Sequence, residues 1–511
     1  MDQPSVLAGL ELDRASAVPI ASQLEAHLRE RIEQGDLAAG SRLPTEQELC
    51  DRLGVSRTTV RSALGPLAER GMLVRTPGRG TFVAPEAWAA DHGVEELSVT
   101  VPNERRCWLL QQAAARWNGE RPEQAVRLRF RIGGPGDLRS RLTLAVARGE
   151  TSDISLVDSV WVAEFAERGY LEPFEEADPA VAAAVRADLV PPLVAQSTFR
   201  GQLFALPAEA DFAVLWYRRD WFAAEGVAPP ATWREWLAAL AHFGQGAVRR
   251  RHAAGPFPLA FAGGAEAGEA TTFQLLAVLW SAGAEVIADR EVALASPEAR
   301  QAVAFVADLV QRHGHAGLDV VTAAANGSAL AFASGSVAMA LGGTYEASLI
   351  RAVTGWDEAE FGERVGFVPV PAGPHGAPAT VLGGLSHVIY RQSRNPALAA
   401  ALLRRSTEPA LLVEAARRAA QNPATRSATA ALEAETDPFL HATAALFPFA
   451  RARWPIPEYA RVSAQIARMF ERAIVGEATP EAAVAEAAVV VAGITGLPER
   501  GRRRRPGRLP A

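Results

Sequence analysis

The residues from Ser56 to Arg61 combine short hydroxylated side chains with two arginines over six positions. Guanidinium groups bind phosphates and guanine edges, and threonine contacts phosphates or the methyl group of thymine. Between Arg57 and Arg79 the sequence contains five arginines and one acid, Glu69, which gives a local charge of +4. This stretch therefore has the side chains that are needed to contact DNA.

A repeat of apolar residues and two capping positions predict the helices around this stretch. The repeat predicts a first helix that ends near Gly35 and buries a stripe formed by Ile20, Leu24, Leu28 and Ile32. Thr45 and Glu48 have the spacing of a capping box, which predicts a second helix. Ser56 is placed to cap a third helix that extends to about Arg70.

A hairpin with a basic tip is predicted after the third helix. Leu73–Thr76 and Thr81–Val83 have the composition of strands, and the Pro77–Gly80 segment between them predicts a turn. Glycines on both sides of Arg79 allow the backbone of this turn to approach a phosphate closely. Three helices and this hairpin predict a winged helix-turn-helix domain over residues 14–85, after a leader of residues 1–13.

These motifs resemble the GntR family of bacterial transcription regulators. The stretches that carry the resemblance are Pro19-Ile20, Leu43–Leu49, Gly54–Arg61 and Gly78–Val83. In that family the start of the recognition helix and the wing bind DNA, which implies contacts here from Thr45, Ser56, Arg57, Thr58, Thr59, Arg61, Arg79 and Gly80. Gln47 departs from the family, which usually has arginine there, so we expect one DNA contact to be weaker or absent.

Composition and charge limit the class of the whole chain. The 511 residues are 49% apolar and 22% charged with a formal net charge of −6, which predicts two or three folded domains and no general coat of nucleic acid. All 52 basic residues are arginine, a bias that we attribute to codon usage. Two cysteines in different predicted domains do not form a disulfide framework. Neither a signal segment nor a bilayer-spanning apolar run is visible, and we expect a cytoplasmic protein.

After a predicted linker at residues 86–96, strand-like runs alternate with helical stretches from residue 97 to residue 497. Leu97–Val101, Arg127–Arg131 and Asp153–Val157 predict strands of a parallel sheet with right-handed crossovers. Ligands bind beyond the carboxyl ends of such strands. Residues 498–511 contain many Arg, Gly and Pro residues and predict a basic disordered tail.

This alternation resembles the extracellular solute-binding proteins of ABC importers, in particular the carbohydrate-binding group. The stretches that carry it are Asp153–Leu171, Gly201–Pro207, Leu215–Tyr217, Phe332–Gly343, Val365–Pro371 and Gly383–Ser386. The resemblance implies a two-lobed α/β domain of the type II periplasmic-binding-protein fold after the winged helix. Lobe 1 is expected at about 97–207 and 384–435, and lobe 2 at about 208–383 and 436–497. The chain is expected to cross between the lobes near Pro207–Phe212, Thr380–Leu385 and 432–442.

Carbohydrates bind to flat aromatic faces and to planar polar side chains. Aligned to the family, the candidate ligand contacts are Asn103, Glu104, Asp158, Trp161, Asp211, Phe273, Gln274, Tyr345, Arg453 and Trp454. Two positions depart from the pattern, because Arg218 stands where the family commonly has Asn and Thr271 replaces a frequent acid. The nine histidines show no metal-ligand spacing, and no cofactor or metal is implied.

Four interpretations follow from these resemblances. The first is a homodimeric, non-catalytic transcription regulator that binds double-stranded operator DNA and senses a sugar or oligosaccharide. The second is the same regulator with an amino acid, peptide or polyamine as its ligand. The third is the solute-binding component of an importer. The fourth, an enzyme with Cys107 as its nucleophile, is the least favoured, because Cys107 is followed by Trp108, Leu109 and Leu110, as in a buried structural cysteine.

Overall fold

The computed structural model describes residues 19–33, 37, 41–69, 72–76, 80–83, 94–133, 138–433 and 437–501. The chain divides into two compact units, Met1–Ile132 and Gly133–Ala511. This boundary lies after the predicted linker, so the first strands predicted for the second domain group with the N-terminal unit. The predicted leader, Arg79 and residues 502–511 lie outside the described ranges.

The N-terminal unit begins with the predicted three helices and hairpin. Their bounds are α1 (Ile20–Glu33), α2 (Glu46–Leu53), α3 (Arg57–Glu69), β1 (Leu73–Thr76) and β2 (Gly80–Val83). The capping box at α2 is confirmed: the Glu48 N–H donates to Thr45 Oγ1 at 3.2 Å, and the Thr45 N–H donates to Glu48 Oε2 at 2.7 Å. Gly54 ends α2 with a positive φ of 62°.

The predicted apolar stripe of α1 packs against α3. The core of this part consists mainly of Leu24, Leu28, Ile32, Leu43, Leu49, Val60, Ala63, Leu64, Leu67, Leu73 and Val83. The Leu43 N–H donates to Thr81 O at 2.8 Å, which joins the segment before α2 to the hairpin. Because Val60 and Leu64 point into the core, the Arg57 and Arg61 side chains lie on the exposed face of α3.

The rest of the N-terminal unit contains a parallel strand pair and a helix. Its elements are β3 (Glu95–Val101), η1 (Glu104–Cys107), α5 (Trp108–Glu120), η2 (Pro122–Gln124) and β4 (Val126–Ile132). β3 and β4 are parallel, with Leu97 opposite Leu128, which confirms this predicted pairing. β3 begins at Glu95, two residues inside the predicted linker.

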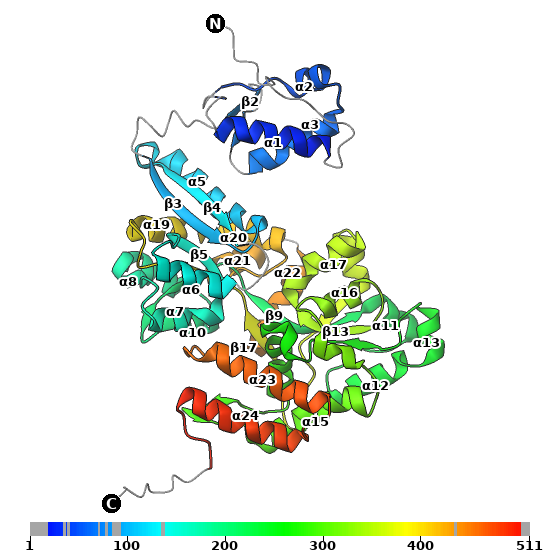
Figure 1. Cartoon of the computed structure of the whole chain (residues 1–511). Helices are drawn as coiled ribbons and strands as arrows, with labels where there is room; N and C mark the ends of the chain where they lie inside the picture. Colours follow the sequence, from blue (N-terminus) through cyan, green and yellow to red (C-terminus); the bar gives the residue numbers. More distant parts are fainter. Residues whose placement is uncertain are drawn as a thin grey trace, which may run out of the picture. The chain divides into compact units, whose positions relative to one another are not determined.

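The described residues of the second unit form two larger sheets, each with its own helices, and two two-stranded sheets (Figure 1). We call the part around the first sheet lobe 1; there β16 (Leu385–Ile389) is antiparallel to both β5 (Ile154–Asp158) and β8 (Ala205–Pro207). The neighbouring elements in chain order are α6 (Leu138–Arg148), η3 (Ser159–Trp161), α7 (Val162–Glu167), α8 (Phe174–Ala177), α9 (Pro179–Asp188), α10 (Pro191–Ser197), β6 (Thr198–Phe199), β7 (Gln202–Leu203) and α19 (Pro396–Ser406). Three more helices follow, α20 (Pro409–Ala419), α21 (Arg426–Glu433) and α22 (Pro438–Ala444).

Lobe 2 surrounds the second sheet, whose strand order is β10-β13-β9-β15-β17, with β14 also pairing with β9. The strands are β9 (Asp211–Arg218), β10 (Leu259–Ala260), β13 (Met339–Gly343), β14 (Val365–Val368), β15 (Thr380–Gly383) and β17 (Ala450–Ala452). Every residue of β9 is buried, as expected for the central strand of a covered sheet.

The helices of lobe 2 cover this sheet and extend to the C-terminal part of the chain. Lobe 2 also contains α11 (Arg219–Glu225), α12 (Trp233–Phe243), α13 (Gly246–Arg251), η4 (Ala265–Ala267), α14 (Glu269–Ser281), β11 (Ile287–Ala288), β12 (Glu291–Val292), α15 (Pro297–Gln311), η5 (Leu318–Thr322), α16 (Gly327–Ala333), η6 (Thr344–Glu346), α17 (Ala347–Thr354), α18 (Glu358–Arg364), η7 (Phe447–Phe449), α23 (Tyr459–Ile474) and α24 (Pro480–Thr495). α23 and α24 pack against each other and against α15 (Figure 1).

The first residues of the predicted disordered tail are folded onto lobe 2. The Val292 N–H donates to Pro498 O and the Arg500 N–H donates to Val292 O, both at 2.9 Å. Arg500 also pairs with Asp289 at 2.7 Å. The prediction is therefore wrong for residues 498–500, because β12 supplies backbone partners that the tail sequence does not reveal.

The two lobes are joined by strands that run in opposite directions. The chain leaves lobe 1 between β8 and β9 and returns between β15 and β16, at two of the predicted crossovers. β15 pairs antiparallel with β9, and β16 pairs antiparallel with β8. The predicted parallel pairing therefore holds for β3 and β4, whereas the strands at the crossovers pair antiparallel, because a chain that leaves and re-enters lobe 1 at the same place must reverse its direction.

Candidate functional site

The exposed surface at the start of α3 contains the predicted DNA contacts. Arg57, Thr58 and Arg61 are exposed, and Thr59 is half-buried. Ser56 Oγ accepts the Thr59 N–H at 3.1 Å and lies 2.8 Å from Thr59 Oγ1, so Ser56 caps α3 as predicted. Ser56 and Thr59 therefore stabilise the start of the helix, while the neighbouring arginines extend from it.

Two residues in the first turn of α2 hold the two arginines. Arg61 Nε pairs with Glu46 Oε2 at 2.8 Å, and 65% of the Arg61 side chain remains exposed. Arg57 donates to Gln47 Oε1 from Nε at 3.1 Å and from Nη2 at 2.5 Å. The four side chains form one polar surface across α2 and α3.

The wing shows why a glycine stands at position 80. Gly80 has a φ of +118°, and a Cβ atom there would come within 3.0 Å of Arg42 Nε. Arg42 is exposed and pairs through its backbone with Phe82. Arg42 is not among the predicted DNA contacts, and it places an additional positive charge beside the wing.

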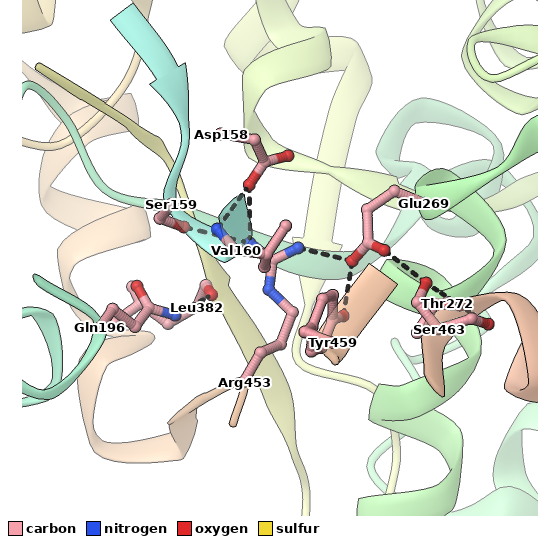
Figure 2. A network of polar contacts seen from close by, with 10 residues as sticks. All are labelled: Asp158, Ser159, Val160, Gln196, Glu269, Thr272, Leu382, Arg453, Tyr459 and Ser463. Carbon is pink, nitrogen blue, oxygen red and sulfur yellow. Dashed lines mark hydrogen bonds and ion pairs between the residues drawn. The ribbon is translucent and has the colours of Figure 1, made fainter. Parts of the chain in front are cut away.

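In the second unit, a polar network around Arg453 connects the two lobes (Figure 2). Arg453 follows β17 of lobe 2, and only 3% of its side chain is exposed. Its Nη2 lies 3.6 Å from Asp158 Oδ1 of lobe 1, and the same Nη2 donates to Ser159 Oγ of lobe 1 at 3.4 Å. Its Nη1 donates to Glu269 Oε1 of lobe 2 at 2.7 Å. Arg453 therefore links β5 to α14.

Glu269 is the acceptor at the centre of this network (Figure 2). In addition to Arg453, the Tyr459 hydroxyl donates to Oε1 at 2.6 Å, and the Ser463 hydroxyl donates to Oε2 at 2.5 Å. Burial raises the pKa of Glu269, whereas the charge of Arg453 acts in the opposite direction. Two hydroxyl donors and one cation thus stabilise a carboxylate whose side chain remains 29% exposed.

Several predicted ligand residues lie together beside this network. The Phe273 ring lies 6.1 Å from the Tyr345 ring and 5.5 Å from the Arg453 guanidinium. A Cβ atom at Gly383 would lie 2.1 Å from Asp211 Oδ1 and 2.8 Å from the Phe273 ring. The structure therefore brings together Asp158, Asp211, Phe273, Tyr345 and Arg453 in what we call the inter-lobe cluster.

Glu346, the next residue after Tyr345, has a buried carboxyl group. Its Oε2 accepts the Gly343 N–H at 3.0 Å and the Trp216 indole N–H at 3.1 Å. Burial raises the pKa of Glu346 to about 8, although these two hydrogen bonds lower it. This carboxyl group is therefore mostly protonated near neutral pH.

The raised pKa of Glu346 makes the stability of lobe 2 depend on pH. Between pH 4.5 and 8 the folded chain retains a proton that the unfolded chain releases, so stability falls as the pH rises through this window. Glu346→Gln removes the titration. We expect the stability of the wild type relative to this variant to fall by a few kcal/mol from pH 5 to pH 8.5, since one pKa unit is about 1.4 kcal/mol. Urea unfolding followed by tryptophan fluorescence measures it; a constant difference would contradict the assignment.

The remaining predicted ligand residues lie elsewhere or make other contacts. Gln274 is buried, accepts the Ala262 N–H at 2.8 Å and lies on another face of α14 from Phe273. Trp454 donates its indole N–H to Ile287 O at 2.9 Å. Trp161 packs against Phe165 in the core of lobe 1, with 6.3 Å between the ring centroids, and remains half-buried.

Asn103 and Glu104 are both exposed in the N-terminal unit, at the start of η1. Cys107 is buried there, and desolvation together with Glu104 raises the pKa of its thiol to about 11. A thiol with a raised pKa is the opposite of an activated nucleophile. The geometry therefore gives no support to the interpretation of Cys107 as a catalytic residue.

Among the residues that the structure describes, no group of three or more His, Cys, Asp or Glu side chains is arranged to hold a metal ion. The described helices also include none that is both long and apolar enough to cross a membrane.

Sequence reasoning missed the residues that organise the inter-lobe cluster. Glu269, Tyr459 and Ser463 lie far from Arg453 or on other elements, and no motif connects them. The sequence did mark two glycines of this region, Gly343 and Gly383, because both belong to Gly-Gly pairs in the stretches that carry the family resemblance. Their function is steric: Tyr345 and Asp211 occupy the space where their side chains would begin.

Comparison with known proteins agrees with this two-part description. Residues 109–410 match the family model of bacterial extracellular solute-binding proteins. A solute-binding protein of Thermotoga lettingae TMO, solved with α-D-tagatose, is 26% identical with a TM-score of 0.65, covering 79% of this chain and 100% of that chain. The GacH receptor of Streptomyces glaucescens has the same fold, with a TM-score of 0.66 at 21% identity over 79% of this chain and 99% of that chain.

Residues 20–83 match the model of the GntR family of bacterial regulatory proteins. The regulator Rv0792c of Mycobacterium tuberculosis is 52% identical over 77 residues, which are 15% of this chain and 28% of that protein. The repressor NagR of Bacillus subtilis is 40% identical over 75 residues, 15% of this chain and 31% of that protein. The match thus spans about three tenths of these regulators. The chain belongs to the bacterial extracellular solute-binding protein family and carries a GntR-family helix-turn-helix domain at its N-terminus.

Proposed function

We propose that this protein is a one-component transcription regulator that acts in the cytoplasm. The observation that carries the proposal is the presence, in one chain, of a winged helix with exposed arginines and a two-lobed solute-binding fold. DNA binding is proposed for Thr45, Ser56, Arg57, Thr58, Thr59, Arg61, Arg79 and Gly80. A helix-turn-helix protein reads two half-sites about one helical turn apart, so we propose a homodimer on DNA.

The proposed ligand is a sugar or oligosaccharide bound at the inter-lobe cluster. Phe273 and Tyr345 supply aromatic rings, and Asp158 and Asp211 supply carboxylates that accept hydrogen bonds from hydroxyl groups. The charge of Arg453 is matched by Asp158 and Glu269, which favours an uncharged ligand over an anionic one. The relative from Thermotoga lettingae was solved with a monosaccharide, α-D-tagatose, which agrees with this class.

The proposed mechanism couples closure of the lobes to DNA binding. A ligand that contacts both lobes binds the closed arrangement more tightly and shifts the population toward it. In a dimer, this shift changes the spacing of the two DNA-binding heads, which changes operator affinity. X-ray scattering from the full chain should show a smaller radius of gyration with ligand, and an unchanged radius would contradict the closure mechanism.

Separation of the two activities tests the proposal. A thermal-shift screen of sugars on the full chain identifies a ligand. Asp211→Asn or Tyr345→Ala should then reduce the ligand-induced shift by at least half without changing DNA mobility shifts, because both residues belong to the inter-lobe cluster and neither belongs to the winged helix. Asp308→Asn, on the exposed face of α15, is the matched control and should respond like the wild type. A normal ligand response in both test variants would place the ligand site elsewhere.

A further inference from the structure

The contact between Arg57 and Gln47 occupies only one edge of the guanidinium group. Nε and Nη2 form this edge and both donate to Gln47 Oε1, at 3.1 Å and 2.5 Å. The opposite edge, formed by Nη1 and the second hydrogen of Nη2, keeps two parallel donors. A guanidinium has five donors in a fixed plane, so fixing one edge also fixes the direction of the other.

Asp51 determines which end of the Gln47 amide faces Arg57. The Gln47 Nε2 donates to Asp51 Oδ1 at 2.8 Å, one helical turn further along α2. The reversed amide would place its NH2 group against the guanidinium and its oxygen against a carboxylate, and both contacts would be repulsive. The relay from Asp51 through Gln47 to Arg57 therefore has one favourable arrangement.

The neighbouring pair of Arg61 and Glu46 differs in charge from the contact between Arg57 and Gln47. Arg61 is held by Glu46, whose carboxylate offsets the positive charge of its partner. Gln47 is uncharged, so Arg57 is held in position while it keeps its full charge. The first turn of α2 thus orients two arginines of α3 and leaves only Arg57 with a neutral partner.

We propose that Gln47 is a positioning residue that presents the free edge of Arg57 to one guanine in each half of the operator. The O6 and N7 atoms of guanine are two adjacent acceptors that match this pair of donors in the major groove. The inference rests on the proposed operator binding. It replaces the weakened DNA contact expected at position 47 with a function that acts through Arg57.

Selection of binding sites from a randomised duplex library tests this proposal. The full chain, Gln47→Ala and the control Gln23→Ala on α1 are each used to select sequences. We expect the wild type and the control to select the same site, with one strongly preferred guanine per half-site. Gln47→Ala should lower that preference by at least about 5-fold and leave the other positions unchanged, since a bidentate base contact corresponds to a discrimination of this order or larger.

Two further variants separate positioning from a general structural effect. Gln47→Glu keeps an acceptor for Arg57 but loses the hydrogen bond to Asp51, so it should retain more of the guanine preference than Gln47→Ala does, while its charge weakens binding to the selected site and to an unrelated duplex alike. In an Arg57→Ala background, Gln47→Ala should cause no additional loss, because both changes remove the same contact. An additional loss in that background would overturn the proposal.

The outcomes also distinguish this inference from the function on which it rests. If the wild type selects no sequence at all, operator binding itself is wrong. If the wild type selects a site and Gln47→Ala selects it with an unchanged guanine preference, operator binding stands and the role of Gln47 is overturned.

Discussion

Arg57→Ala should weaken operator binding by roughly 30-fold or more while leaving the thermal shift caused by ligand unchanged. A bidentate contact between arginine and guanine contributes about 1–3 kcal/mol, and a dimer loses it in both half-sites. Arg57 is exposed, and its side chain hydrogen-bonds to the surface residue Gln47, so its loss should not unfold the winged helix. Mobility shifts on the selected operator measure the effect.

A matched charge removal controls for general electrostatics. Arg29→Ala removes one arginine from α1, where its weak pair with Glu25 is 4.0 Å long and 42% of the Arg29 side chain is exposed. It should reduce affinity only slightly and equally for all sequences. Arg61→Ala should have a smaller effect than Arg57→Ala, because Glu46 already offsets its charge. Equal losses from Arg29→Ala and Arg57→Ala would show that α3 does not read the operator.

Arg453→Met is expected to produce the largest loss of stability in the solute-binding part, about 3–5 kcal/mol of unfolding free energy. The substitution leaves Glu269 among Tyr459 and Ser463 without its cation, at a site where burial already raises the pKa of this carboxyl group. Glu269 then takes up a proton more readily, so the loss should be smaller at pH 5 than at pH 8. Urea unfolding at the two pH values measures this loss of unfolding free energy.

Arg451 provides the matched control two residues earlier in the chain. It pairs with Glu285 at 2.6 Å, but 42% of its side chain is exposed, so Arg451→Met should cost less than about 1 kcal/mol. The double variant Arg453→Met with Glu269→Gln should recover part of the stability, because no unpaired carboxylate remains. Equal losses of unfolding free energy from Arg451→Met and Arg453→Met would contradict the structural role of the polar network around Arg453.

The winged helix could be predicted from the sequence because its determinants are close together along the chain. The apolar stripe of α1 repeats every four residues, and the Thr45–Glu48 capping box spans a single turn. These signals fix where helices begin and which face is buried, whatever the rest of the chain does. They also place Arg57 and Arg61 on the exposed face of α3.

The sequence identified candidate ligand contacts in the second unit but not how these residues are arranged in space. Phe273 and Gln274 are neighbours on α14, yet only the first lies in the inter-lobe cluster, because adjacent helical residues point about 100° apart. The adjacent residues Arg453 and Trp454 likewise contact different partners: Arg453 pairs with Glu269, and Trp454 donates to the Ile287 carbonyl. Only the packing around each element decided which neighbour faces the cluster.

The sequence by itself determined the class of each domain, the helices of the winged helix and the arginines available for DNA. The tertiary structure alone decided the contacts between residues that are distant in sequence: Gln47 with Arg57 across two helices, and Arg453 with Glu269 and Asp158 across two lobes. It also decided the antiparallel crossings. The physical reason is that propensity and periodicity act over a few residues, whereas these contacts depend on how complete elements pack and where the chain changes lobes.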